Sequence, residues 1–281
     1  TFDYQKFDYH LGAAFTKPGV FTPDTDLNFS LYATRQVFDD FSENFGGGSV
    51  FLTHFLSDEV TLKGGGFAEY YEFDDDGATQ DFVTFGLTGS LEYDTRDNAL
   101  DPTSGFLISG ELKPFYEFNY QNFGLRSEVE GRYYLSLSKD DRAVLATRML
   151  VGSVSGPSRD EVPDNLLFFA GGGGSVRGYG FNNIGIVEAD GDVTGGRSKI
   201  EGSIEARFKI TEKFGVVAFA DAAIVSDDSF PSFDEDLKAG VGLGIRYFTG
   251  LGPIRLDVAI PLNRGPDDPS FGIYAGIGQA F

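Results

Sequence analysis

The sequence predicts an all-β protein, and specifically an antiparallel transmembrane β-barrel, on the basis of three observations. Apolar and polar residues alternate with a period of two along many successive segments, which is the periodicity of a strand and not of a helix. The chain is rich in residues that favour strands, tight turns and aromatic belts at membrane interfaces, with 38 Gly, 29 Phe and 13 Tyr among its 281 residues. No segment approaches the roughly 18 consecutive apolar residues of a transmembrane helix.

The segment from residue 198 to residue 211 shows the alternation clearly. One face carries Lys199, Glu201, Ser203, Glu205, Arg207 and Lys209, and the other carries Ile200, Gly202, Ile204, Ala206, Phe208 and Ile210. Residues 125–133 and 254–262 alternate in the same way. A soluble β-sandwich buries its apolar face, but here the opposite face repeatedly holds charges of both signs. We therefore expect the charged faces to line a barrel lumen and the apolar faces to meet lipid.

We predict thirteen such strands, each long enough to cross a bilayer when tilted. They begin near residues 5, 26, 46, 60, 82, 105, 122, 142, 198, 214, 237, 253 and 270. Short connections, as at 138–141, alternate with longer acidic ones, as at 226–236, like the turns and outer loops of outer-membrane barrels. The last strand, 270–281, ends in Phe281, a familiar terminal residue of such barrels. An odd count would leave an unpaired edge in lipid, so we expect further strands or a partner to close the sheet.

Charge and cysteine content exclude several classes of partner and chemistry. The formal net charge of −21 argues against nucleic acid as a partner, because the backbone phosphates would be repelled. The absence of Cys excludes disulfide frameworks, thiol catalysis and thiolate metal sites. Much of the acid falls in short runs, which we interpret as solvated loops in preference to divalent-cation sites near lipopolysaccharide. The runs are Asp39-Asp40, Asp74-Asp75-Asp76, Asp227-Asp228, Asp234-Glu235-Asp236 and Asp267-Asp268.

The longest segment without strand character runs from residue 156 to residue 197. It contains four consecutive glycines, Gly171 to Gly174, which do not suit a regular strand and let the backbone fold back sharply. The spacing of glycines up to Gly178 has the form G-x-G-x-x-G, but no strand and helix flank it, so we expect no nucleotide cofactor. No cluster of residues has the spacing of a metal site, and we expect no bound metal.

This segment resembles the inward-folded sixth extracellular loop of the BamA/TamA superfamily of outer-membrane assembly factors. The V-R-G-F/Y motif of that family is matched here by Val176, Arg177, Gly178 and Tyr179. The upstream F-Y-A-G-G stretch of the family is matched by residues 169–172.

Other segments resemble the same family in the same order. Residues 91–106 resemble its D-T-R-D-x-x-L-D-P-T-x-G turn, and residues 240–262 resemble the pair of strands before the last. Residues 219–223 resemble its F-V-D-x-G strand, although Ala223 stands in place of the final Gly. The resemblance covers most of the chain, and the sequences of these motifs are closer to those of TamA-like members than to those of BamA.

The resemblance implies a sixteen-stranded barrel of which residues 1–281 represent the last thirteen strands, with an inward-folded loop at 156–197. The first three strands and the periplasmic POTRA repeats would then lie outside this chain. It also implies a place in the bacterial outer membrane and a function in inserting, folding or secreting proteins such as autotransporters, without nucleotide. The implied partners are outer-membrane lipid and lipopolysaccharide, client outer-membrane proteins, and an inner-membrane-anchored TamB-like protein.

Arg177 is the candidate functional residue to which the resemblance points most directly. In the family the loop arginine reaches into the lumen and pairs with a carboxylate of the wall, which a guanidinium can bind through two hydrogen bonds. We expect Asp221 or Glu205 as the partner, since Asp221 shares a face with Phe219 that should be the lumen face. The alternative is that Arg177 is one more charge in a wider lumen network. Gly178 is expected to serve backbone geometry, and Tyr179 to pack against the lumen wall or simply fill the lumen.

The last strand carries the second expected site. In the family the first and last strands pair weakly, so the barrel opens sideways and an incoming strand adds to the exposed edge. Gly272, Gly276 and Gly278 would weaken side-chain packing in this strand, which ends at Phe281. The glycines would equally serve to make room for lumen contents.

We expect no enzymatic activity. His10 and His54 are the only histidines, and both fall in alternating strands without a nucleophile motif beside them. Asp94 and Asp97 of the D-T-R-D turn are expected to cap the turn through backbone amides and not to act as a catalytic carboxylate pair. Two other functions remain open, a two-partner-type secretion pore that shares the loop motif and a passive diffusion porin that would lack it.

Overall fold

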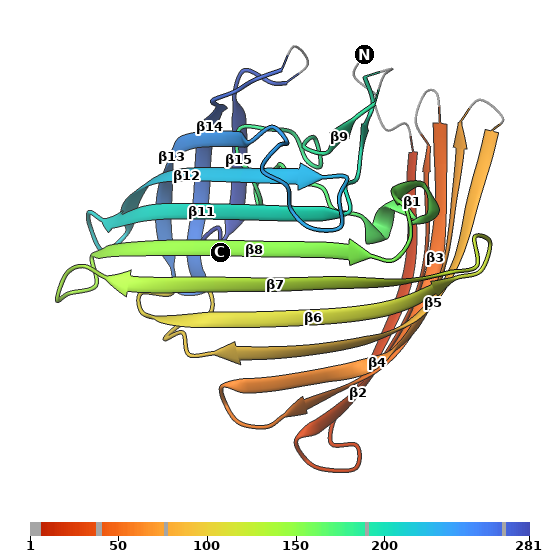
Figure 1. Ribbon diagram of the computed structural model, residues 1–281. Helices are drawn as coiled ribbons and strands as arrows, with labels where there is room; N and C mark the ends of the chain where they lie inside the picture. Colours follow the sequence, from red (N-terminus) through yellow and green to blue (C-terminus); the bar gives the residue numbers. More distant parts are fainter. Residues whose placement is uncertain (1–6, 38–40, 76–77, 189–190, 266–267) are drawn as a thin grey trace. The chain divides into compact units, whose positions relative to one another are not determined.

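Thirteen strands of the computed structural model form one antiparallel sheet in chain order, and two further short strands pair separately (Figure 1). The structure describes residues 7–37, 41–75, 78–188, 191–265 and 268–281. The strands of the large sheet are β1 (Phe7–Lys17), β2 (Thr25–Val37), β3 (Phe41–Phe55), β4 (Val60–Asp75), β5 (Ala78–Asp94), β6 (Gly105–Glu117), β7 (Asn122–Ser136), β8 (Ala143–Ser155), β11 (Ser198–Lys209), β12 (Phe214–Ser226), β13 (Lys238–Thr249), β14 (Gly252–Pro261) and β15 (Gly272–Ile277). The predicted fold class, strand number and strand order are confirmed for this part of the chain.

Several predicted strand ends were wrong. β3 begins at Phe41, well before residue 46, because its backbone continues to pair with β4 as far as Asp75. β15 ends at Ile277 and not at Phe281, because Gly278 adopts a φ of 86° and the next amide, that of Gln279, donates to the carbonyl oxygen of Leu100 at 3.0 Å. The expected start of the first strand, near residue 5, lies outside the described residues.

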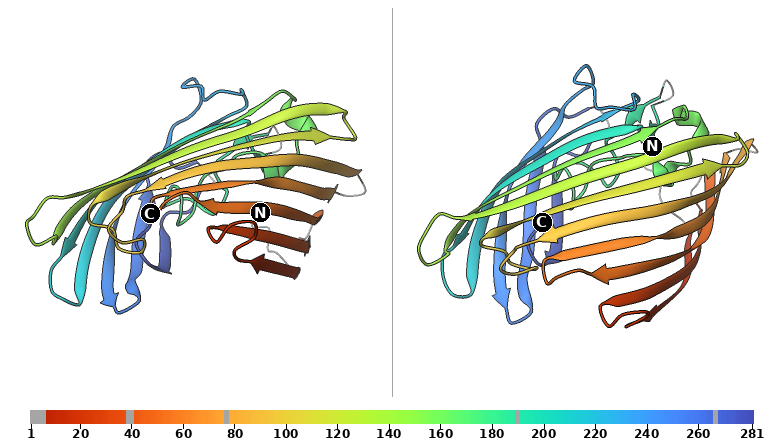
Figure 2. Two further views of the ribbon diagram at one scale, coloured as in Figure 1. Left: turned by 90° about the horizontal axis from the view of Figure 1, so that it is seen from below. Right: turned by 60° about the horizontal axis from the view of Figure 1, so that its bottom comes forward.

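The chain forms two compact units. The first contains Thr1–Glu92, Gly110–Ser127 and Ser155–Leu166, and the second contains Tyr93–Ser109, Glu128–Val154 and Leu167–Phe281. In the first unit β1 to β4 pair in chain order, as the red and orange strands of Figure 2 show. Side-chain hydrogen bonds between hydroxyl and carboxylate groups also connect these strands. For example, the Tyr32 hydroxyl on β2 donates to Glu69 Oε1 on β4 at 2.9 Å.

The second unit has its charged face buried and its apolar face exposed. Its strands β8 and β11 to β14 are consecutive neighbours, drawn green to blue in Figure 2. On β14, Asp257 is fully buried, whereas the four aliphatic side chains are between 46% and 49% exposed, namely those of Ile254, Leu256, Val258 and Ile260. A soluble sheet has the opposite polarity, so these strands have the pattern of a wall whose outer face meets lipid.

In the described part of the segment between β8 and β11, the elements are short. They are the 3-10 helices η1 (Arg159–Glu161) and η2 (Asp164–Leu166) and the strands β9 (Ile186–Val187) and β10 (Val193–Thr194). The part of the segment that belongs to the second unit folds back on itself, since Phe168 bridges to Gly196 and Ala170 bridges to Ile184. The pairing of β9 with β10 was not predicted, because two-residue strands leave no readable periodicity.

Among the described residues no helix is long and apolar enough to span a membrane. The acidic run Asp234-Glu235-Asp236 is exposed between β12 and β13, as expected of a solvated loop. Asp39, Asp40, Asp76 and Asp267, which belong to other acidic runs, lie outside the described residues.

The D-T-R-D turn between β5 and β6 is held by side-chain bonds to backbone amides, so its predicted capping role is confirmed. Asp94 Oδ1 accepts from the Arg96 amide at 3.0 Å. Asp97 Oδ1 accepts from the amides of Thr103 at 2.9 Å and Ser104 at 3.1 Å, and Asp97 Oδ2 accepts from the Thr103 hydroxyl at 2.6 Å. Partial burial raises the pKa of Asp97, but these bonds outweigh it and hold the pKa below its ordinary value.

Replacing Asp97 by asparagine is expected to lower the free energy of unfolding by about 1 kcal/mol, since three bonds to a charged acceptor are weakened at an exposed turn. A carboxylate with a depressed pKa stabilises the fold above its unfolded pKa of about 4 and loses this effect as the pH falls through the folded value. Urea unfolding of the wild-type and Asp97→Asn proteins should therefore differ at pH 7 and converge near pH 2. A difference that does not change with pH would contradict this account of the turn.

Candidate functional site

Arg177 lies at the centre of a buried ion network. Its Nε and Nη2 atoms donate to the two oxygens of Asp221 at 2.8 and 2.9 Å, and its backbone amide donates to Asp221 Oδ2 at 3.1 Å. Its Nη1 atom donates to Glu205 Oε1 at 2.7 Å and to Asp257 Oδ2 at 3.2 Å. The guanidinium carbon also lies 3.4 Å from the centroid of the Phe219 ring, within cation–π range. The structure thus brings Arg177 against both expected carboxylates and adds Asp257.

Two further arginines share these carboxylates. Arg207 Nε donates to Glu205 Oε2 at 2.8 Å, and Arg246 Nη1 donates to Asp257 Oδ1 at 2.5 Å. We call the six residues the lumen network, and each of them is at most 6% exposed. Its members are Arg177, Arg207, Arg246, Glu205, Asp221 and Asp257. Three cations therefore face three anions, so Arg177 both pairs with the expected partners and belongs to the wider network that was the alternative.

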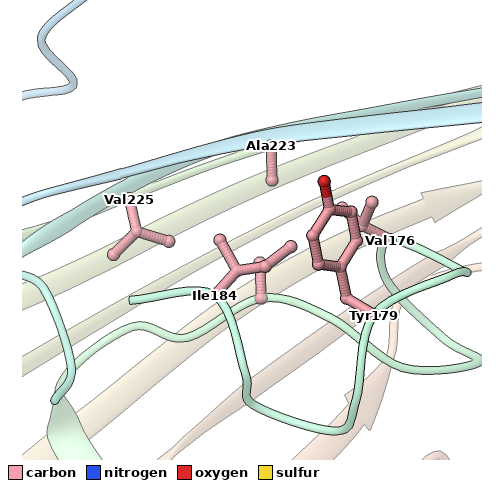
Figure 3. Packing of buried hydrophobic residues seen from close by; sticks show 6 residues of the cluster. Val176, Tyr179, Ile184, Ala223 and Val225 are labelled. Carbon is pink, nitrogen blue, oxygen red and sulfur yellow. The ribbon is translucent and has the colours of Figure 1, made fainter. Parts of the chain in front are cut away.

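The apolar residues of the motif pack against β12. Val176 and Tyr179, with Ile184 further along the loop, form a buried cluster with Ala223 and Val225 of that strand (Figure 3). The Tyr179 hydroxyl donates to Asn263 Oδ1 at 2.8 Å, so the end of this ring is also held. Tyr179 is 1% exposed and lies where packing against the wall would place it.

Glycines on both sides of the contact let the loop backbone approach the wall. Gly178 has a φ of 109°, and a Cβ atom there would lie 2.8 Å from the backbone nitrogen of Pro261. On β13, a Cβ at Gly240 would lie 2.0 Å from the carbonyl oxygen of Arg177, and one at Gly244 would lie 1.9 Å from Asp257 Oδ1. The motif is therefore in direct backbone contact with the wall as well as in ionic contact.

A second group of charges holds the glycine-rich part of the loop. The Ser175 hydroxyl donates to Glu201 Oε2 at 2.6 Å and accepts from the Gly171 amide at 3.0 Å. Lys199 Nζ lies 3.2 Å from the same Glu201 oxygen, and Arg148 forms an ion pair with Glu201 Oε1. Gly171 and Gly172 have φ values of 104° and 97°, which side-chain-bearing residues rarely adopt.

The expected residues of the last strand face the inside of the second unit. A Cβ at Gly272 would lie 2.4 Å from the Tyr274 hydroxyl, and one at Gly276 would lie 2.8 Å from Arg255 Nε. Gly278 provides the turn after the strand, and the carbonyl oxygen of Phe281 accepts from Arg207 Nη2 at 3.1 Å. These contacts fit the interpretation in which the glycines make room for lumen contents.

Each histidine ring lies within hydrogen-bond distance of a threonine hydroxyl on the neighbouring strand. His10 Nδ1 lies 2.7 Å from the Thr34 hydroxyl, and His54 Nδ1 lies 2.8 Å from the Thr25 hydroxyl. Each pair joins neighbouring strands of the first unit. These histidines therefore have the environment of cross-strand contacts.

Sequence reasoning missed several residues that hold the loop, either directly or through a shared carboxylate. They are Asp257, Arg207 and Arg246 of the lumen network, Glu201 and Arg148 beside Ser175, and Tyr274 on β15. The sequence does contain one feature that they share, since each is a polar residue on the inward face of its strand. The sequence alone did not indicate which of the inward-facing charged residues would contact the loop.

These features define a class of protein, a membrane-spanning β-sheet wall with a loop folded inward and fixed by buried charges. The Omp85 superfamily domain matches residues 1–281, and the chain belongs to that superfamily. It is therefore part of a bacterial outer-membrane β-barrel.

One curated relative is similar in sequence, and two solved structures are similar in fold. The outer membrane protein assembly factor BamA of Nitratidesulfovibrio vulgaris is 29% identical over an alignment of 274 residues, which covers 91% of this chain and 34% of the relative. BamA from Haemophilus ducreyi lacking POTRA domains 1–3 has a TM-score of 0.77 and 18% identity, over 95% of this chain and 61% of that one. CdiB from Acinetobacter baumannii has a TM-score of 0.67 and 12% identity, over 97% and 50%. The chain thus spans about a third of the length of the curated relative from Nitratidesulfovibrio vulgaris.

Proposed function

We propose that this chain is the membrane part of an outer-membrane assembly factor, which helps insert, fold or secrete other outer-membrane proteins and performs no chemistry itself. The observation that carries the proposal is the V-R-G-Y motif held by the lumen network. Burying six charges is costly unless each is well paired, so the fixed position of this loop needs a reason. A passive diffusion porin has no need for such a motif, whereas a family relative is named an assembly factor.

The mechanism that we propose acts through the backbone of the last strand. β15 is at the end of the strand order and pairs with β14 over only six residue pairs. An edge strand presents free N–H and C=O groups, which are a template for an incoming strand of a client. This mode of action requires no cofactor and no bound nucleotide.

We further propose TamA-like clients, namely autotransporters, together with a TamB-like partner in the inner membrane. The sequence resemblance of the loop and turn motifs supports this choice. The named curated relative is a BamA, so the alternative client set is the general range of outer-membrane barrels. Affinity purification of the full-length protein from its own envelope would separate the two, since recovery of BamA-type accessory proteins in place of a TamB-like protein would reject the TamA-like assignment.

The assembly activity itself is tested by reconstitution. The full-length protein is placed in lipid vesicles, an unfolded barrel client is added, and folded client is measured as a heat-modifiable, protease-resistant band. We expect folding to be faster than in vesicles that carry an unrelated barrel of similar size. Unchanged client folding combined with high steady conductance would indicate a porin. Client protein found inside the vesicles without insertion would indicate a secretion pore.

A further inference from the structure

The end of the last strand is held more by contacts inside the second unit than by the sheet. β15 pairs with β14 from Gly272 to Ile277 only. After the turn at Gly278, the Gln279 amide donates to the Leu100 carbonyl oxygen at 3.0 Å, away from the β14 ladder. We call residues 278–281 the tail. The Gly278 amide still donates to the Pro253 carbonyl oxygen of β14 at 2.7 Å, so the residues after Gly278 are the ones that need other interactions to fix their position.

The strand itself is bonded directly to the loop motif. The Tyr274 hydroxyl accepts a hydrogen bond from the Gly178 amide at 2.8 Å and donates one to the Tyr179 carbonyl oxygen at 2.8 Å. One side chain of β15 thus bonds to two backbone groups of the motif. Both hydrogen bonds require the loop to lie against the wall, which we call its seated position.

The tail is bonded to two arginines of the lumen network. Arg246 Nε donates to Gln279 Oε1 at 2.7 Å, and Gln279 Nε2 in turn donates to Asp101 Oδ1 at 2.8 Å. Arg207 donates to the Phe281 carbonyl oxygen, and its guanidinium carbon lies 5.3 Å from the centroid of the Phe281 ring.

The same two arginines are oriented by carboxylates that they share with Arg177. Glu205 places one oxygen on Arg177 and the other on Arg207, and Asp257 bridges Arg177 and Arg246. If Arg177 leaves, Glu205 and Asp257 can reorient and draw Arg207 and Arg246, whose other nitrogens hold the tail, away from their present positions. The loop and the tail are therefore held in place by one shared set of charges.

We propose that the loop motif, the lumen network and the tail form a single latch, in which seating of the loop fixes the end of the last strand and release of either one loosens the other. Tyr274 and Gln279 are its positioning residues. This inference rests on the proposed function in one respect, since a latch on the edge strand gives an assembly factor a way to keep that edge closed until a client arrives.

Hydrogen–deuterium exchange on the full-length protein in lipid nanodiscs, without any client, tests the latch in both directions. Arg177→Lys alters the loop and makes no direct change to β15 or the tail. We expect amides of residues 272–281 to exchange on the order of tenfold faster in this variant, the effect of about one lost hydrogen bond to a charged group. Gln279→Ala alters only the tail, and we expect the amides of residues 176–180 to exchange several-fold faster, because coupling between two sites is reciprocal.

Tyr247→Phe is the matched control, because Tyr247 lies on the exposed face of β13 and its ring contacts Phe214. It should leave both regions at wild-type rates, and amides of β11 and β12 should remain protected in every variant. Unchanged loop exchange in Gln279→Ala would overturn the latch even if Arg177→Lys failed to fold. Coupled exchange in a protein that does not accelerate client folding would uphold the latch and reject the proposed function.

Discussion

Replacement of Arg177 by alanine is expected to lower the free energy of unfolding by about 3–5 kcal/mol, the usual cost of removing one partner from a buried ion pair. Asp221 would lose two side-chain hydrogen bonds, while Glu205 and Asp257 would keep only Arg207 and Arg246. The variant would contain three buried carboxylates against two guanidinium groups. We therefore expect the motif to leave its site.

Two measurements report this outcome. The sequence has no Trp, so unfolding by urea in lipid vesicles is followed by the heat-modifiable shift on gels. Limited chymotrypsin digestion reports the loop when the cleavage sites are mapped by mass spectrometry. Phe181 is 84% exposed and can be cut in either protein, whereas Tyr179 is 1% exposed in the seated position, so cleavage after Tyr179 should appear in the variant alone. Arg177→Lys, which keeps the charge but loses the two-pronged geometry, should fall between wild type and alanine. Wild-type stability and protection in Arg177→Ala would show that the network does not hold the loop.

Replacement of Gly240 by alanine is expected to displace the loop without changing any loop residue. The new Cβ atom would lie 2.0 Å from the carbonyl oxygen of Arg177, and a backbone atom cannot move aside alone. Overpacking alone costs about 1–3 kcal/mol, and loss of the ion network should bring the total close to that of Arg177→Ala. Because both substitutions disrupt one contact, the double variant should be little worse than either single variant.

Gly131→Ala is the matched control for this substitution. Gly131 also lies within a strand, β7, but a Cβ atom there would have no neighbour within 4 Å. Its stability should remain within about 0.5 kcal/mol of wild type, and Tyr179 should stay protected from cleavage by chymotrypsin. Additive effects of Gly240→Ala and Arg177→Ala would mean that the glycine acts through sheet packing and not through the loop.

The sheet could be predicted because its determinants are local. A period-two pattern with charges on one face needs no knowledge of distant residues, and it located all thirteen strands in order. The end of β15 could not be predicted in the same way. The turn at Gly278 depends on an acceptor at Leu100, which is remote in the chain.

The site was predictable to the extent that one face of each strand was known. Once a motif resemblance placed Arg177 inside, the inward carboxylates Glu205 and Asp221 became candidate partners. Asp257 had the same inward position but lies 80 residues from Arg177, and only the pairing of β13 with β14 brings it within reach. Arg246 meets Asp257 through the same pairing, whereas Arg207 lies two residues from Glu205 on one strand face and its place in the network was not recognised.

The partners of Arg177 also impose an order of events on the folding chain. Glu205 is on β11, Asp221 on β12 and Asp257 on β14, and all three follow the loop in the sequence. No single hairpin contains them, so a partly built wall offers the guanidinium group an incomplete set of counter-charges. Since an incompletely paired buried charge is strongly unfavourable, the loop gains its full stability only after β14 is in place. The seated motif is therefore a late event, and it marks a wall that has already been completed as far as its penultimate strand.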